Sequence, residues 1–387
     1  MEMAAAEAEA AIRAAVTALQ RGHSAVARTL LLDVIERGSP LPAPWFMLAQ
    51  ACRHAGDGEG EARALDKVLE AQPRHIGALI MRGDCHARAG DRRAAGSFYR
   101  AASKAAAAAG QVPPMLASEL RRAEAAAADL DREFADHVER SLAAVAAPGR
   151  AAEAVDILLG RRQVYLQQPT SFYFPGLPQI EYFPRDDFPW LADIEAAAPA
   201  IREELLGVMA EDGAFTPYVE ADPNRPPAVG AQLLGDPSWS AFHLFQAGRP
   251  HPENAPRCPR TMEALAHAPL PFIRGRSPMA LFSLLRGGAH IEPHNGLLNT
   301  RLICHLPLIV PEGCSLRVGN QVRSWEEGRA LVFDDSIEHE AWNRSGETRV
   351  ILLFEIWRPE LTEGEREALT ALFEAITDYG ALPMDEG

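Results

Sequence analysis

The sequence lacks the features that mark secreted, disulfide-rich and membrane-spanning proteins. Its 387 residues include five scattered cysteines and no Cys-X-X-Cys pair, a usage typical of reduced thiols. No apolar run approaches the roughly 18 residues of a membrane-spanning helix, so we expect no membrane span. The N-terminal residues 1–7 have neither the basic nor the apolar segment of a secretory signal. These absences predict a cytoplasmic location.

Positive charge is also in deficit. The chain has 38 Lys and Arg residues against 53 Asp and Glu residues, which gives a formal net charge of −15. Binding to nucleic acid or to an anionic membrane surface needs clustered positive charge, so the sequence disfavours both partners. The apolar and charged contents of 47% and 24% are those of soluble globular proteins. At about 150 residues per domain, the length predicts two or three domains.

The first part of the chain repeats a helical pattern. Up to about residue 145 it is rich in Ala, Arg and Glu, with apolar residues at helical spacing. Three glycines that break this pattern, Gly22, Gly56 and Gly90, are spaced by 34 residues, the period of tetratricopeptide repeats. We therefore predict a tetratricopeptide-like helical repeat domain over 1–148, with a generic Ala-rich helical bundle as the alternative. Its expected role is to bind a polypeptide or to act as a helical support.

Composition changes near residue 150, where aromatic residues and prolines become frequent. We expect one helix over 191–211 and long loops over 213–262. Further on, short β-type runs separated by turn signals cover 280–285, 301–306, 315–318, 329–333 and 349–357. Such a pattern predicts a double-sheet jelly roll. The predicted fold class is therefore α+β multidomain, with all-α helical repeats at 1–148 followed by a jelly-roll or cupin-like domain at 165–387.

Two histidines in the β-rich region and a downstream arginine form the skeleton of an Fe(II) site that uses 2-oxoglutarate. His294 precedes His339 by 45 residues, and Arg349 lies ten residues beyond His339. Non-haem Fe(II) in oxygenases is usually held by two histidines and one carboxylate, which leaves positions open for the cosubstrate and O₂. Here Gly296 stands where the carboxylate is expected. The guanidinium of Arg349 is suited to bidentate pairing with the distal carboxylate of 2-oxoglutarate; an ordinary strand-end arginine is the alternative.

Two further residues are candidate contacts for the cosubstrate. Ser283 lies in a strand that leads towards His294, and its hydroxyl is a donor for the same carboxylate. The alternative is a plain sheet serine. His305 lies in an apolar run, where a hydrogen-bonded core histidine is the usual interpretation and a cosubstrate contact is the functional one.

Acidic residues near the two histidines are candidates for the missing ligand or for its support. Glu292 lies two residues before His294, on the same period-two face as His290, so we consider it as a third metal ligand. Side chains at that spacing diverge on a strand, which favours a role for Glu292 other than that of a metal ligand. Asp334 and Asp335 are expected to build the turn before the second histidine or to orient its ring.

At these residues the sequence resembles the aspartyl/asparaginyl β-hydroxylase family. The resemblance is dense over 280–361 and looser over 170–280. The matching motifs are Pro293–Gly296, Asn299–Leu302, His305–Leu306, Gly313–Cys314, Trp325–Gly328, Phe333–Trp342 and Trp357–Leu361. Animal members of the family also carry tetratricopeptide-like helices before the oxygenase domain, which is similar to the architecture expected here.

The resemblance implies a double-stranded β-helix fold, Fe(II), 2-oxoglutarate as cosubstrate and O₂. It also implies a metal held by only two protein ligands, which accounts for the glycine. By motif match the catalytic iron ligands are His294 and His339, the 2-oxoglutarate contacts are Ser283, His305 and Arg349, and the substrate-carboxylate contact is Arg301. Members with peptide substrates often have a second arginine where this chain has Ile303, so substrate recognition is expected to differ.

The leading functional hypothesis is a 2-oxoglutarate-dependent dioxygenase that hydroxylates Cβ of Asp or Asn residues in a peptide or protein substrate. One alternative keeps the chemistry and changes the substrate to a lipid acyl chain or a free amino acid. Another is a catalytically inactive, repeat-based binding protein. The helical repeats favour a macromolecular substrate.

Overall fold

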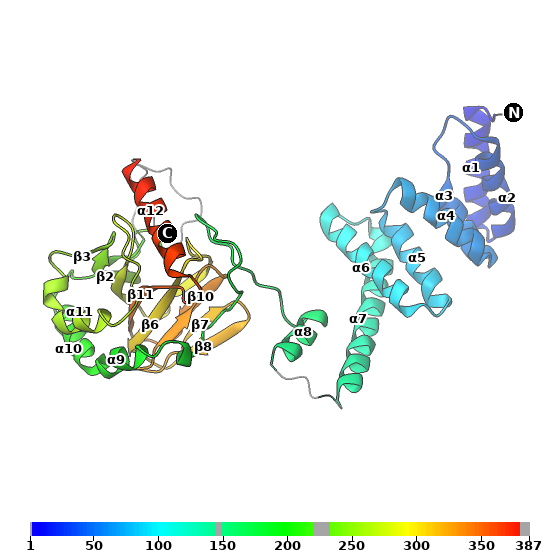
Figure 1. Cartoon of the computed structure of the whole chain (residues 1–387). Helices are drawn as coiled ribbons and strands as arrows, with labels where there is room; N and C mark the ends of the chain where they lie inside the picture. Colours follow the sequence, from blue (N-terminus) through cyan, green and yellow to red (C-terminus); the bar gives the residue numbers. More distant parts are fainter. Residues whose placement is uncertain (1, 144, 146–148, 220–232, 380–387) are drawn as a thin grey trace. The chain divides into compact units, whose positions relative to one another are not determined.

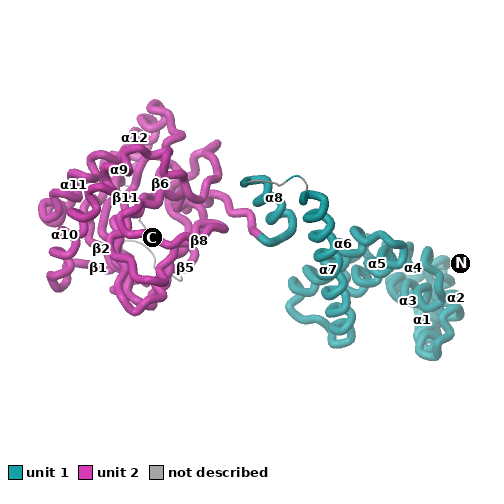
Figure 2. The backbone as a smooth tube through the Cα atoms, turned by 90° about the horizontal axis from the view of Figure 1, so that it is seen from below, with its two compact units in different colours: residues 1–161 teal, residues 162–387 magenta. Residues whose placement is uncertain are grey.

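The computed structural model describes residues 2–143, 145, 149–219 and 233–379. The chain divides into two compact units, Met1–Arg161 and Arg162–Gly387, shown in different colours in Figure 2. Across the described ranges no helix has the length and apolar character needed to cross a membrane. All five cysteines are free thiols.

The N-terminal unit consists of helices joined by tight turns. They are α1 (Ala5–Gln20), α2 (Ser24–Arg37), α3 (Trp45–Ala55), α4 (Gly58–Ala71), α5 (Ile76–Arg88), α6 (Arg92–Ala109), α7 (Pro114–Leu142) and α8 (Arg150–Leu158). Gly22, Gly56 and Gly90 lie in the turns within the pairs α1–α2, α3–α4 and α5–α6, with φ of 78°, 75° and 81°. Only glycine adopts this left-handed backbone readily, so the 34-residue glycine spacing reports three successive helix pairs. The predicted helical repeat is confirmed.

Small residues and helix caps shape these pairs. The side chains of Asp57 and Asp91, directly after two of the turn glycines, accept hydrogen bonds from Gly60 N and Ala94 N and so cap α4 and α6. Within the third pair, a Cβ added at Gly83 would lie 2.6 Å from the ring of Tyr99. The helices can therefore approach this closely only because residue 83 has no side chain.

The C-terminal unit is built on two sheets, as the predicted jelly roll requires. The first has the order β1-β2-β4-β11-β6-β9, with β3 paired to β2, and the second has the order β5-β10-β7-β8. The strands are β1 (Thr216–Pro217), β2 (Trp239–Gln246), β3 (Arg249–Pro250), β4 (Ala280–Leu285), β5 (His290–His294), β6 (Arg301–Ile309), β7 (Cys314–Val318), β8 (Gln321–Ser324), β9 (Leu331–Phe333), β10 (His339–Asn343) and β11 (Arg349–Trp357). Within the described ranges every pairing of these strands is antiparallel.

The two faces of the seven-stranded sheet have different neighbours. Its outer face packs against α9 (Leu191–Ala196), α10 (Ala198–Met209) and α11 (Pro259–Leu265), as Figure 1 shows. Alternate residues of β11 and β6, such as Phe354 and Leu306, point into this core. The residues between them face the second sheet and line a cavity. The terminal helix α12 (Glu363–Asp378) packs on a separate cluster around Phe373.

Two sequence-based expectations for this unit are wrong. The single helix expected over 191–211 is two helices that meet at Ala197. Pro199, the second residue of α10, has no N–H to continue the hydrogen-bond ladder of α9. The long loops expected over 213–262 include β2, whose apolar side chains face the helical core, and also α11. The flanking prolines and glycines concealed both elements.

Substitution of Gly56 tests the turn geometry of the repeat. We expect Gly56→Ala to destabilise the helical unit by about 1 kcal/mol, because φ is 75° and an L-residue is strained there. Gly58→Ala is the matched control, since Gly58 begins α4 and a Cβ there meets nothing within 4 Å. Urea unfolding of the full chain, followed by far-UV circular dichroism, should show a loss for the first variant and no loss for the second.

Candidate functional site

The two histidines singled out in the sequence are direct neighbours across a strand pair. His294 ends β5, His339 begins β10, and the two are register partners in the antiparallel pairing. Their ring centroids lie 4.1 Å apart. Both line a cavity between the two sheets that has about 90 Å³ of space for water-sized molecules.

A β-bulge decides which side of β5 faces this cavity. His339 pairs with His294 but Ala341 pairs with Ile291, so β5 has one residue more than β10 between these pairs. The extra residue brings His294 and Ile291 to the same face. Glu292 is exposed and does not line the cavity, so the expectation that it shares a face with His294 is wrong. Pro293, which cannot donate to a ladder, was the sequence signal for the bulge.

Backbone carbonyls orient both rings. His294 Nδ1 lies 2.8 Å from Glu292 O, and His339 Nδ1 lies 3.1 Å from Ile337 O. A carbonyl accepts, so each Nδ1 carries the proton and each Nε2 keeps its lone pair for a metal. Burial lowers the pKa of His294, and burial together with His294 lowers the pKa of His339 well below its usual range. Both rings are therefore neutral, the form that binds metal ions.

The donor set fits a metal held by two protein ligands. Across the described ranges, no three His, Cys, Asp or Glu side chains gather closely enough to hold a metal ion. The space that a side chain at Gly296 would take is filled by Asp335, because a Cβ there would lie 2.1 Å from Asp335 Oδ2. A carboxylate from another loop therefore takes the place of a side chain at Gly296. The sequence analysis gave Asp335 only a turn-building or ring-orienting role.

Three further candidate residues come from neighbouring strands of the first sheet. Ser283, on β4, is the register partner of Ile351 on β11. His305, on β6, is the register partner of Leu353 on the same strand β11. Ser283, His305 and Arg349 all line the cavity. Antiparallel pairing and the two-residue side-chain period thus bring together residues that are up to 66 positions apart (349 − 283).

Arg349 is a buried charge without a carboxylate partner in the described part of the chain. It is 1% exposed, and its Nε has no hydrogen-bond partner there. Its guanidinium lies 4.9 Å from the ring centroid of Trp325, and burial lowers the pKa of Arg349 to about 10. A buried cation is costly unless paired, so the geometry calls for an anionic ligand.

His305 and Ser283 complete the polar surface around this cation. Both ring nitrogens of His305 are buried without a partner in the described residues. Burial and the nearby Arg349 lower the pKa of His305 well below its usual range, so the ring is neutral. Ser283 Oγ accepts from Trp239 Nε1 at 3.3 Å, which leaves the serine proton to donate. The sequence analysis missed Trp239, which lies in the region expected to be loops.

Arg301 lines the same cavity but is held by two acidic side chains. It forms an ion pair with Glu355 and, at 3.4 Å between Nη2 and Oδ2, another with Asp335. All three residues are almost fully buried. The next cavity-facing residue of β6 is Ile303, which brings no charge. Local sequence gave no sign of Glu355, because it reaches Arg301 only through the pairing of β11 with β6.

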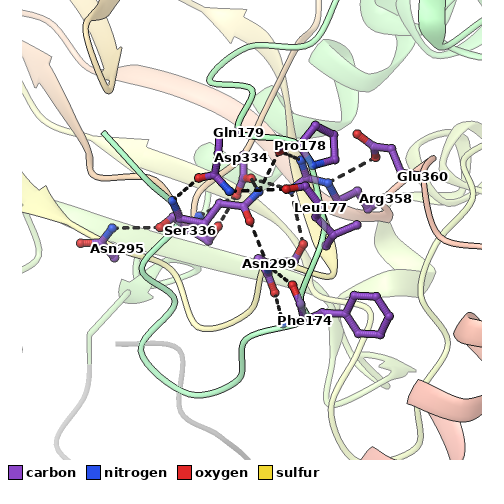
Figure 3. A network of polar contacts seen from close by, with 11 residues as sticks. Phe174, Leu177, Pro178, Gln179, Asn295, Asn299, Asp334, Ser336, Arg358 and Glu360 are labelled. Carbon is purple, nitrogen blue, oxygen red and sulfur yellow. Dashed lines mark hydrogen bonds and ion pairs between the residues drawn. The ribbon is translucent and has the colours of Figure 1, made fainter. Parts of the chain in front are cut away.

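A buried polar network fixes the loops that carry the histidines (Figure 3). Asp334 accepts from Arg358 Nη1 at 2.5 Å, from Gln167 Nε2 at 2.7 Å, and from both the backbone N and Oγ of Ser336. Asp334 and Arg358 are 0% exposed. An ion pair with this many hydrogen bonds satisfies both buried charges and fixes the loop before His339.

The same network includes a segment that precedes the first sheet, residues 167–179, which we call the strap. Asn299, in the loop after His294, donates to Gln167 Oε1 at 3.0 Å and exchanges hydrogen bonds with the backbone of Phe174. Arg358 Nη2 donates to Pro178 O at 2.6 Å. The strap therefore holds both histidine loops at once. Sequence reasoning missed it because Gln167 is 132 residues from Asn299.

Gln167 provides the test of the strap. Gln167→Ala removes hydrogen bonds to Asp334, Asn299 and Pro178, so we expect a stability loss of about 1–3 kcal/mol. We also expect roughly tenfold weaker Mn²⁺ binding, because the histidine loops lose their support. The matched control is Gln168→Ala, since that side chain is exposed and only its backbone N bonds to Ser336 O. Calorimetric titration with Mn²⁺ measures both variants, and equal affinities would remove the strap from the site.

Comparison with known proteins shows what part of this unit is similar to. The family model for aspartyl/asparaginyl beta-hydroxylase matches residues 195–359. The human aspartyl/asparaginyl beta-hydroxylase is 38% identical over 175 residues, which are 44% of this chain and 21% of that protein. The ornithine lipid ester-linked acyl 2-hydroxylase of Rhizobium tropici is 37% identical over 175 residues, 44% of this chain and 58% of that protein.

A further relative and a solved structure also match parts of this chain. The aspartate beta-hydroxylase domain-containing protein 2 of Xenopus tropicalis is 32% identical over 213 residues, 54% of this chain and 55% of that protein. The matched region thus spans about a fifth to three fifths of these relatives. A crystal structure of PcrH with the chaperone binding region of PopB covers 33% of this chain and 99% of PcrH at 16% identity, with a TM-score of 0.29. Residues 195–359 are therefore similar in sequence to the aspartyl/asparaginyl β-hydroxylase family.

Proposed function

We propose that this chain is a 2-oxoglutarate-dependent, non-haem iron hydroxylase that acts on Cβ of an Asp or Asn residue in a peptide or protein. The observation that carries the proposal is one cavity lined by both a pair of neutral histidines and a buried arginine that has no carboxylate partner among the described residues. A metal site alone, or an anion site alone, would suit many reactions. Their combination suits an enzyme that uses a metal together with an acidic cosubstrate.

In this proposal His294 and His339 hold Fe(II) through their Nε2 atoms. Fe(II) supplies the activation of O₂ for attack on an unactivated C–H bond. The reaction converts substrate R–H, 2-oxoglutarate and O₂ into R–OH, succinate and CO₂, with one oxygen atom in the alcohol and one in succinate. The histidines contribute fixed orientation, because the backbone carbonyls of Glu292 and Ile337 hold their Nδ1 protons.

The cosubstrate is assigned to the opposite side of the cavity. Arg349 pairs with the distal carboxylate of 2-oxoglutarate, and Ser283 donates a hydrogen bond to it. His305 is neutral, and its ring nitrogens have no hydrogen-bond partner among the described residues. Its ring N–H is therefore offered to the same distal carboxylate. These residues lie on β4, β6 and β11 in the middle of a sheet, so their positions are rigid.

A second substrate class has one specific observation in its favour. Much of the cavity wall is apolar, with Trp239, Met279, Ile351 and Leu353 among its residues. The relative from Rhizobium tropici is named for an acyl chain hydroxylase. A lipid acyl chain is therefore the alternative substrate, and free amino acids follow it. The helical repeats of the N-terminal unit favour the polypeptide.

Succinate release tests the proposal directly. The full chain, loaded with Fe(II) under argon, is given 2-oxoglutarate, O₂ and pools of Asp- and Asn-containing peptides. Peptide-stimulated succinate together with a gain of about 16 Da, one oxygen atom, is the expected result for this cofactor chemistry. Succinate without any peptide product would move the proposal to acyl substrates. No succinate from protein that retains iron would contradict it.

The histidine pair gives the first variant test. His294→Ala and His339→Ala are each expected to abolish succinate release and to weaken Co²⁺ or Mn²⁺ binding, because one ligand cannot hold the ion in this site. His290→Ala is the control, since His290 lies on the other face, bonded to Glu340 and stacked on Trp342. Unchanged succinate release in either of the first two variants would exclude that residue as a ligand.

Arg349 gives the second variant test. We expect Arg349→Ala to raise the apparent KM for 2-oxoglutarate roughly 30-fold, from the loss of a charge-assisted contact worth about 2 kcal/mol. Arg344→Ala is the matched control, because Arg344 lies over an aromatic ring in the same way, 4.8 Å from the Trp342 centroid, but is exposed. Steady-state kinetics with varied 2-oxoglutarate provide the measurement. The same KM in both variants would remove Arg349 from the cosubstrate site.

A further inference from the structure

Two positively charged side chains line the described part of the cavity, and their partners decide which substrate group each can bind. Among the described residues that line it, Arg301 and Arg349 are the two with a permanent positive charge. Arg349 has no carboxylate partner in these residues and is assigned to the cosubstrate. A substrate carboxylate that sought a cation in the described part of the cavity would therefore have to use Arg301.

Arg301 is not available as a free cation. Glu355 lies against one end of its guanidinium, and Asp335 Oδ2 lies 3.4 Å from Nη2. Glu355 is held in this position by a second contact, because its other oxygen accepts from Met279 N at 3.0 Å. One guanidinium thus faces two acidic side chains. A substrate carboxylate would add a third acid to the group, and like charges at close range repel.

The same cluster offers complementary groups to a neutral side chain. Asp335 is 6% exposed, and its Oδ1 has no hydrogen-bond partner in the described residues. It is an acceptor beside a donor, Arg301, and both residues line the cavity. A carboxamide presents the matching pair, with an NH₂ that donates to Asp335 and a carbonyl that accepts from Arg301. A carboxylate presents acceptors alone and leaves Asp335 Oδ1 without a donor.

Ile303 also favours an uncharged substrate side chain over an acidic one. It faces the cavity between Arg301 and His305 on β6, and it is 4% exposed. An apolar side chain at that place gives no compensating charge to an acidic substrate. It imposes no electrostatic cost on an uncharged one.

We propose that this cavity selects an asparaginyl side chain over an aspartyl side chain, through the compensated cluster of Arg301, Glu355 and Asp335. The inference rests on the proposed hydroxylase function and narrows its substrate to a polypeptide carboxamide. It assigns to Glu355 a role in specificity that no motif in the sequence indicated. An acyl chain presents neither a carboxamide nor a carboxylate to the cluster, and the use of acyl chains as substrates is one outcome of the test.

Matched peptide pools test the selection. One pool has a central Asn flanked by randomised residues, and the other has a central Asp in the same positions. The full iron-loaded chain is expected to hydroxylate the Asn pool with at least about tenfold higher kcat/KM, since a site built for one polar pattern rejects its mismatch. Equal rates, or a preference for Asp, would overturn the inference and leave the hydroxylase proposal standing. Succinate without product from either pool would overturn the polypeptide assignment itself, and with it this inference.

A second variant pair isolates the cluster. Glu355→Gln removes one acid from Arg301 while keeping an acceptor for Met279 N, so the Asn-to-Asp ratio is expected to fall about tenfold. The KM for 2-oxoglutarate should not change, because Arg349 is untouched. Glu204→Gln is the matched control, since Glu204 also accepts backbone hydrogen bonds, from Arg260 N and Thr261 N, while its side-chain partner is the Thr261 hydroxyl and not Arg301. An unchanged ratio in Glu355→Gln would contradict the role of the cluster.

A folding defect in Glu355→Gln would not end the test. Ile303→Arg places a new cation on the cavity face and is expected to lower the Asn-to-Asp ratio in the same direction. Circular dichroism first establishes that the variant is folded. A folded Ile303→Arg protein with the original ratio would also contradict the inference.

Discussion

The antiparallel pairing of β5 with β10 is the constraint on which the rest of the site depends. It makes His294 and His339 register partners, so two residues 45 positions apart lie side by side. The bulge in β5 then turns His294 towards the space between the sheets and Glu292 away from it. Without the extra residue, the strand's two-residue period would present Glu292 together with His294. A backbone irregularity, rather than a missing residue type, therefore keeps this acid out of the cavity.

The polar network behind the histidines explains how such an irregular place is kept rigid. Loops next to a cavity have few ladder hydrogen bonds of their own and tend to move. Here the buried pair of Asp334 and Arg358, with Gln167 from the strap, provides those bonds instead. The matched family region begins at residue 195, yet the strap lies before it. The polar network therefore extends beyond the residues that the family model matches.

The two buried arginines show how one residue type is given different roles by its surroundings. Arg349 lies over the ring of Trp325 and has no carboxylate partner among the described residues, so its charge remains available to a ligand. Arg301 is compensated by Glu355 and Asp335, and its role becomes one of hydrogen-bond pattern rather than charge. The same guanidinium group thus favours an anion in one part of the cavity and disfavours it in the other.

Local pattern in the sequence was enough for many of the elements and for the histidines and Arg349, but not for β2 or α11. Glycine spacing predicted the helix pairs, β-type runs between turn signals predicted β4 and β11, and the histidines and Arg349 were identified from their positions in that pattern. The tertiary structure alone decided the face of Glu292, the entry of Asp335 into the space beside Gly296, and the pairing of Glu355 with Arg301. Periodicity describes neighbours along a helix or strand, whereas these three features arise between segments that meet only when the sheets close. Pro293 is a local hint of the bulge, but a cross-strand ion pair leaves no such hint in the sequence, and these features set the charge and shape of the cavity.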